Sequence, residues 1–130
     1  MLRPRTILMV LTALLAAATV LWMQGRFEAA DERASLALVQ EYRSRTGAGL
    51  PALIAERHHQ RPVAWSTATE SACFQHVRVH AVVEEPGSAA TLYAFTVDIN
   101  GPVIHPANEA SRELMKLLDE PPPAPSGAAP

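Results

Sequence analysis

Two stretches of alternating apolar and polar residues, FQHVRVHAVVE at 74–84 and TLYAFTVDIN at 91–100, decide the fold. Apolar side chains occupy the odd-numbered positions: Val77, Val79, Ala81 and Val83 in the first stretch, and Tyr93, Phe95, Val97 and Ile99 in the second. A period of two is the pattern of a strand that buries one face. The intervening Glu85-Pro86-Gly87-Ser88 has the composition of a turn. The sequence therefore predicts an antiparallel β-hairpin with one apolar face.

Two registers of this hairpin keep like faces together, because the residue numbers of a pair must then sum to an even value. In the first register Val79 lies opposite Val97, and Arg78 lies opposite Asp98. A shift by two residues places His76 opposite Asp98 instead. Either register gives Asp98 a cationic or hydrogen-bonding partner. The polar face is the candidate interaction patch, and its side chains are His76, Arg78, His80, Thr96 and Asp98.

The residues after the hairpin complete a small sheet and its cover. Asn100-Gly101 favours a second turn, and Val103-Ile104-His105 follows as a short third strand. Asn108 is suited to cap a helix that runs to about Leu118. The apolar stripe of that helix would cover the apolar sheet face with Ala110, Leu114, Leu117 and Leu118. We therefore expect one core shared by Val79, Phe95 and Leu117.

The chain before the hairpin predicts two helices. Residues 27–45 contain no proline or glycine, and they carry an apolar stripe at every fourth position, namely Ala30, Ala34, Leu38 and Tyr42. Gly47 would cap this helix, which can continue directly from the N-terminal apolar run through Gly25. A second short helix is predicted for residues 50–59, with Pro51 in its first turn. The fold class is thus α+β, an antiparallel β-meander covered by a C-terminal helix.

The N-terminus carries an apolar run of 17 residues without charge, which begins at Ile7 and ends at Met23. As a helix it spans roughly 25 Å, slightly short of the ~30 Å hydrocarbon core of a bilayer. Arg3 and Arg5 precede it, so the positive-inside rule places residues 1–6 in the cytoplasm and the C-terminal domain outside. The run is expected to be a transmembrane anchor that contacts the lipid bilayer as a single pass through the cytoplasmic membrane.

A cleaved signal peptide is the alternative for this segment, and it would give a secreted protein. Ala16-Ala17-Ala18 offers the small residues that a signal peptidase needs. The apolar run continues past this point to Met23, which favours the uncleaved anchor. The predicted organisation is an anchor at 7–23, a juxtamembrane helix and cap at 24–49, a small exported α+β domain at 50–120, and a disordered proline-rich tail at 121–130.

Composition and motifs remove several classes of function. The 130 residues hold 11 basic and 13 acidic side chains, a net charge of -2, so the chain lacks the concentrated basic surface that nucleic acid requires. Its single cysteine excludes an internal disulfide. The sequence contains neither a G-x-S-x-G nucleophile elbow nor a glycine-rich phosphate loop. We therefore expect neither an enzyme nor a bound cofactor.

The histidines suggest an alternative chemistry, a metal-binding or sensing site. On a strand, His76 and His80 share a face but stand about 13 Å apart, and Cys73 points to the other face. In a helix, Cys73, His76 and His80 would fall on one side instead. The valine-rich composition of the segment favours the strand, so no metal site is expected. His58 and His59 suit the carbonyl end of a short helix as cations.

These features predict a single-pass, membrane-anchored accessory protein. Its small extracytoplasmic α+β domain is expected to bind or position a protein partner in a membrane complex. The polar face of the hairpin is the candidate surface for that partner. A histidine-based metal binder or sensor in the same compartment is the alternative function.

Overall fold

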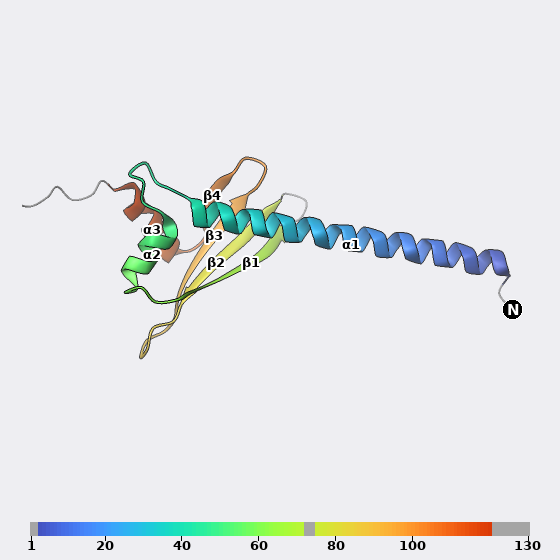
Figure 1. The fold of residues 1–130 in the computed structure, drawn as a ribbon, viewed down its shortest axis with the longest axis horizontal. Coiled ribbons are helices and arrows are strands. Elements are labelled where there is room, and N and C mark those ends of the chain that lie inside the picture. The colour runs from blue at the N-terminus through green and yellow to red at the C-terminus, as the bar shows by residue number, and fades with distance from the viewer. Residues whose placement is uncertain (1–2, 72–74, 121–130) are drawn as a thin grey trace, which may run out of the picture.

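A computed structural model describes residues 3–71 and 75–120 and has an α+β fold. A long N-terminal helix and a C-terminal helix accompany a four-stranded antiparallel sheet (Figure 1). In chain order the elements are α1 (Pro4–Glu41), α2 (Leu50–Arg57), β1 (Val63–Ser71), β2 (His76–Val83), β3 (Thr91–Asp98), β4 (Val103–Pro106) and α3 (Glu109–Asp119). The predicted fold class is confirmed at this level. Cys73 and the predicted tail at 121–130 lie outside the described residues.

Helix α1 is continuous over 38 residues and passes through Gly25 without a break. Its N-terminal part projects beyond the rest of the molecule (Figure 1), and the side chains at 7–23 are exposed along it. The hydroxyls of Thr12 and Thr19 donate to carbonyls of the preceding turn, which satisfies them within the helix. By length and composition, this helix is able to cross a membrane.

The C-terminal part of α1 packs on the sheet through a different stripe from the predicted one. Ser35 and Val39 are its buried residues. Each follows a member of the predicted stripe by one position, so the buried face is rotated by about 100°. The predicted stripe is only half-buried or exposed, and it consists of Ala30, Ala34, Leu38 and Tyr42. Contact with the sheet, and not the spacing of the alanines, sets the buried face.

The end of α1 also differs from the prediction. The helix ends earlier, at Glu41, and Tyr42 is extended. The next residues form a tight loop, which is closed by a β-bridge between Arg43 and Gly49. Gly47 lies in that loop at φ +85°, a conformation that favours glycine, so it serves the loop and not a helix cap.

The sheet is an antiparallel meander with the strand order β1-β2-β3-β4, and it contains the predicted hairpin as β2 and β3. The register is the second one predicted, with His76 opposite Asp98, and the first register, which put Arg78 there, is wrong. Val83 pairs with Thr91, so the connecting loop is two residues shorter than in the first register. A shorter loop costs slightly less entropy to close, which favours this register. The predicted short strand is confirmed as β4.

Strand β1 was not predicted, although it pairs with β2 along most of its length. It begins at Val63, and its odd-numbered residues Trp65, Thr67 and Thr69 are half-buried. The residues between them are small or polar: Ala64, Ser66, Ala68 and Glu70. Because threonine and alanine differ little in polarity, the two faces of this strand differ little in hydrophobicity and the alternation is weak. The aromatic and β-branched residues at odd positions are the signal that indicates a strand.

All three helices bury side chains against the odd-numbered face of β2 and β3. The core consists of Val39, Leu50, Ile54, Val79, Ala81, Val83, Tyr93, Phe95, Val97, Leu114 and Leu118. Val79 and Phe95 belong to it as predicted, but Leu117 is 42% exposed. Leu114 and Leu118 fill the core from α3 instead. Leu117 points about 100° away from Leu118 on the helix, and in the observed orientation of α3 only Leu118 is buried.

Asn108 caps α3 as predicted, and it also closes the free edge of β3. Its side chain accepts a hydrogen bond from the Ser111 N–H at 2.9 Å and donates to the Leu92 carbonyl at 2.7 Å. The Ser111 hydroxyl oxygen accepts from the Ala94 N–H at 2.7 Å. Because β4 ends at Pro106, the first residues of β3 lack a strand neighbour on this side, and the two side chains supply partners there.

Candidate functional site

The face of the sheet opposite the core is the candidate interaction surface. We call it the open face, because the core side chains of the described helices pack on the other side. By register, it carries the even-numbered side chains of β1, β2 and β3, together with Val103 and His105 of β4. Most of its side chains are exposed or half-buried, with Ala94 as a buried exception. The five predicted patch residues lie on this face and are half-buried, namely His76, Arg78, His80, Thr96 and Asp98.

The ion pairs on the open face follow the observed register. His76 Nε2 lies 3.8 Å from Asp98 Oδ2, and about two fifths of each side chain is exposed. Arg78 pairs with Glu70 of β1 and not with Asp98. Exposed pairs of this kind contribute little to folding, about 0–1 kcal/mol. Their charges are therefore available for a partner at small cost to the fold.

The open face carries two further histidines, His80 and His105, of which only His80 belongs to the predicted patch. His80 lies between Ser66 of β1 and Ala94 of β3. Within the described residues, His80 makes no hydrogen bond or ion pair with another side chain. His105 lies opposite Thr96 and is exposed, so it extends the patch onto β4. His105 was not part of the predicted patch, although its place in the predicted third strand was an available signal.

The geometry of β2 bears on the alternative metal site. Residues 76–83 form a strand, so His76 and His80 lie four residues apart along an extended backbone. The helical arrangement that would bring them together is absent from this strand. The third member, Cys73, lies outside the described residues. Across residues 3–71 and 75–120, histidine, cysteine and carboxylate side chains form no group of three or more that could hold a metal ion.

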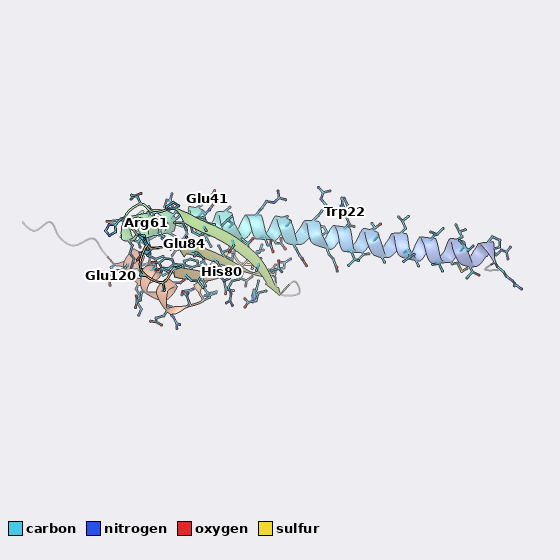
Figure 2. The ribbon with its side chains drawn as sticks, turned by 90° about the horizontal axis from the view of Figure 1, so that it is seen from below. Trp22, Glu41, Arg61, His80, Glu84 and Glu120 are labelled. Atoms are coloured by element: carbon cyan, nitrogen blue, oxygen red, sulfur yellow. The ribbon has the colours of Figure 1, made fainter. Side chains whose placement is uncertain are left out.

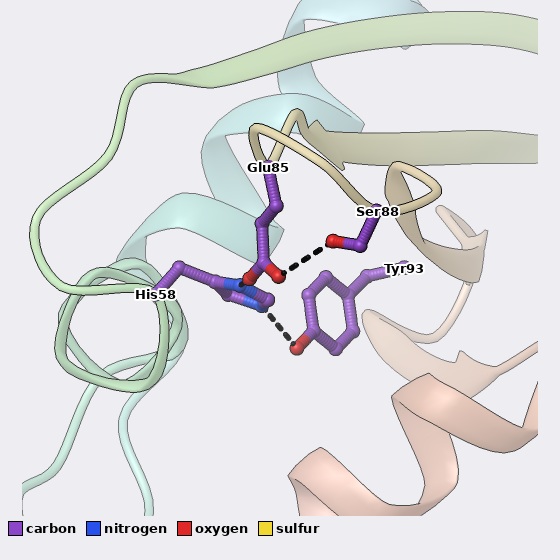
Figure 3. A network of polar contacts seen from close by, with 4 residues as sticks. All are labelled: His58, Glu85, Ser88 and Tyr93. Atoms are coloured by element: carbon purple, nitrogen blue, oxygen red, sulfur yellow. Dashed lines mark hydrogen bonds and ion pairs between the residues drawn. The ribbon is translucent and has the colours of Figure 1, made fainter.

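A buried histidine away from the open face joins α2 to the hairpin. His58 lies at the end of α2 as its C-cap residue, as expected, but it is only 5% exposed and makes side-chain contacts that the sequence did not predict. Its Nδ1 lies 2.5 Å from Glu85 Oε1, and its Nε2 lies 2.8 Å from the Tyr93 hydroxyl (Figure 3). Ser88 also donates to Glu85, at 3.3 Å. These contacts tie the end of α2 to the β2–β3 connection and to β3.

The protonation states in this network follow from burial and hydrogen bonding. The hydrogen bond from His58 is the main reason why the pKa of Glu85 lies below its ordinary value. Burial raises the pKa of Tyr93, so its hydroxyl stays protonated. Glu85, His58 and Tyr93 contact one another in the order carboxylate, imidazole and hydroxyl, which is also the order of the groups in a catalytic triad. Because Tyr93 is 2% exposed, no substrate can reach this hydroxyl in the described structure, and we assign the network a structural role.

Acid is expected to weaken this network. Because the pKa of Glu85 is lowered by folding, its stabilisation is fully present above the pKa of an unfolded glutamate, about 4.3, and is lost as the pH falls through the lower folded value. We expect Glu85→Gln to lower the unfolding temperature at neutral pH. The difference from the parent should shrink below about pH 4. Thermal unfolding of the full chain in detergent, followed by circular dichroism across this pH range, measures it.

The neighbouring carboxylate provides the control for this experiment. Glu84 is exposed and makes no contact with His58 in the described structure, so Glu84→Gln should leave the pH profile of the parent unchanged. Equal unfolding temperatures for Glu85→Gln and the parent at neutral pH would show that the network does not stabilise the fold.

Comparisons with protein-family models, with curated proteins and with solved structures found no match to this chain.

Proposed function

We propose that this chain is a single-pass membrane protein whose extracytoplasmic domain binds or positions a protein partner through its open face. The observation that carries the proposal is the division of α1 into an exposed apolar part and a part packed on the sheet. Exposure of a long apolar helix to water is unfavourable, whereas a bilayer covers its apolar side chains. The packed part then fixes the domain directly to the anchor.

The orientation of the proposed anchor rests on charge. Arg3 and Arg5 stand before the apolar part of α1, and the first acidic residue after it is Glu28. Positively charged residues at the start of an apolar helix favour a cytoplasmic N-terminus. The sheet and the other helices would then lie outside the cytoplasm, as would the partner.

The open face has the chemistry of a polar interaction surface. It combines a guanidinium, three imidazoles and carboxylates with small neighbours such as Ser66 and Ala68, which let a partner approach the sheet closely. Charge-assisted hydrogen bonds to such groups give orientation and specificity. The proposal therefore assigns recognition to His76, Arg78, His80, Thr96 and Asp98, with His105 added.

A double substitution tests the surface. Arg78→Ala together with Asp98→Ala should leave folding nearly intact, since exposed pairs contribute about 0–1 kcal/mol. Capture of the partner from detergent-solubilised membranes, identified by mass spectrometry, should fall about tenfold or more, because arginines are frequent hot spots of interfaces. Retained capture would show that the open face is not the interface.

An exposed ion pair on α3, away from the open face, provides the matched control. Glu109 and Arg112 pair at 3.4 Å on α3, and both are well exposed. Glu109→Ala with Arg112→Ala removes the same charges away from the open face, so partner capture should persist. If the parent protein instead purifies without a partner and with stoichiometric bound metal, this result supports the metal-binding alternative and contradicts the proposed partner function.

A further inference from the structure

The sheet meets α1 directly after the apolar run ends. A groove of about 150 Å³ lies between the two, and its walls include Phe27, Glu28 and Asp31 of α1 with Thr69, Gln75 and Val77 at the β1–β2 end of the sheet. Phe27 lies four residues beyond the end of the run at Met23, and its side chain is 64% exposed. The β1–β2 end is therefore the part of the sheet closest to the proposed anchor.

The depth of this end follows from helix geometry. Four residues of helix rise about 6 Å. The polar headgroup layer adds about 5–7 Å to each side of the hydrocarbon core. If Met23 marks the edge of the hydrocarbon, Phe27 and the β1–β2 end stand at the level of the headgroups.

The connection between the anchor and the sheet contains no flexible joint. Helix α1 is unbroken from Pro4 to Glu41. Glu32 of α1 is bound to β1, where its carboxylate accepts hydrogen bonds from the Thr69 N–H at 3.1 Å, the Thr69 hydroxyl at 3.0 Å and the Thr67 hydroxyl at 3.3 Å. The β1–β2 end therefore cannot swing away from the helix without breaking these contacts.

The side chains at this level suit an interface between lipid and water. Trp22 lies on the part of α1 that stands clear of the sheet (Figure 2), and the Arg26 guanidinium stacks on its ring at 4.8 Å. Tryptophan is enriched at this depth. Just beyond it, α1 carries Arg26 and Arg33 together with Glu28, Asp31 and Glu32. Because positive charge is not in excess here, no anionic lipid is required.

We propose that the β1–β2 end of the domain, with Phe27, Thr69 and Gln75, rests on lipid headgroups, so that the domain is seated on the bilayer surface. This inference rests on the proposed membrane anchor. The lipid surface it fits is zwitterionic, such as phosphatidylcholine. Seating fixes the orientation of the open face relative to the membrane, because the strands are held to α1.

Site-specific fluorescence tests the seating. The full chain with Cys73→Ser receives one new cysteine, either Gln75→Cys at the β1–β2 end or Ala89→Cys in the β2–β3 connection. The second position lies in the connection that follows the other end of β2, and eight strand residues span about 25 Å. Each cysteine carries a fluorophore, and the protein is reconstituted in phosphatidylcholine vesicles with headgroup nitroxide in both leaflets. We expect several-fold stronger quenching at 75 than at 89.

A lengthened helix is the matched variant. Seven residues of glutamine and glutamate inserted after Gly25 add two turns, which lift the domain about 10 Å and nearly preserve its rotation. Quenching at 75 should then fall to the level at 89. Unchanged quenching after the insertion, or equal quenching at the two positions in the parent, overturns the seating.

Flotation separates failure of the seating from failure of the anchor. Protein that floats with the vesicles but shows equal quenching at 75 and 89 supports the proposed anchor and contradicts the proposed seating. Protein that does not float with the vesicles contradicts the anchor, and the seating falls with it.

Discussion

Phe95→Ala is expected to bring the domain close to unfolding. Phe95 is fully buried in the core, on the face of β3 that the helices cover. Removing a buried phenylalanine costs about 3–5 kcal/mol, since burial is lost and a cavity is left. Small domains have about 5–15 kcal/mol of stability, so most of a modest reserve would be lost. Denaturant unfolding of the full chain in detergent, followed by circular dichroism, measures the change.

Leu92 supplies a control on the same strand. It lies on the open face and is 43% exposed, so Leu92→Ala should change the free energy of unfolding by less than about 1 kcal/mol. Equal losses of unfolding free energy in Phe95→Ala and Leu92→Ala would mean that the two faces of β3 are buried to the same extent. A small loss at Phe95 would mean that the odd-numbered face is not the core.

The hairpin could be predicted because burial of one face imposes its own period on the sequence. Val79 and Phe95 carry that period, and both are in the core. The cap of α3 could be predicted for a similar reason, since Asn108 bonds to a backbone group only three residues away. Both signals are local. They need no knowledge of what lies across the molecule.

Features that depend on tertiary contact could not be predicted in the same way. Two registers of the hairpin satisfy the rule of like faces, and the choice depends on the loop that closes it. Which side of α1 is buried depends on where the sheet meets the helix, so Val39 and not Leu38 is fully buried. Leu117 looked as apolar as Leu118, and only the direction of α3 separates them.

The buried network at His58 shows the same limit for the candidate sites. Its partners Glu85 and Tyr93 are 27 and 35 residues away in the chain, so no local pattern joins the three. The sequence did contain one signal that His58 is buried. His58 continues the spacing of four that begins with Leu50 and Ile54, the buried residues of α2. A histidine on the buried stripe of a helix indicates a side chain with partners in the interior.

Arginine in the middle of the apolar run is expected to abolish membrane anchoring. Leu14 and Leu15 lie near its centre and are exposed on α1, so the fold of the sheet does not depend on them. Each arginine at the centre of a membrane helix costs about 2.5–3.5 kcal/mol, and two cost about 5–7 kcal/mol. That is more than three powers of ten in the partition between bilayer and water. Leu14→Arg with Leu15→Arg should move the protein from the pellet to the supernatant in alkaline membrane extraction.

A reporter and a matched variant complete this test. An enzyme that is active only outside the cytoplasm, fused after Pro130, should be active in the parent and inactive in the arginine variant. Leu14→Ala with Leu15→Ala alters the same two side chains but keeps the run free of charge, so this variant should remain in the pellet with an active reporter. Retention of the arginine variant in the pellet would mean that the bilayer does not hold α1. Soluble parent protein that begins near Thr19 would mean that the segment is a cleaved signal peptide, which would contradict both the proposed anchor and the proposed seating.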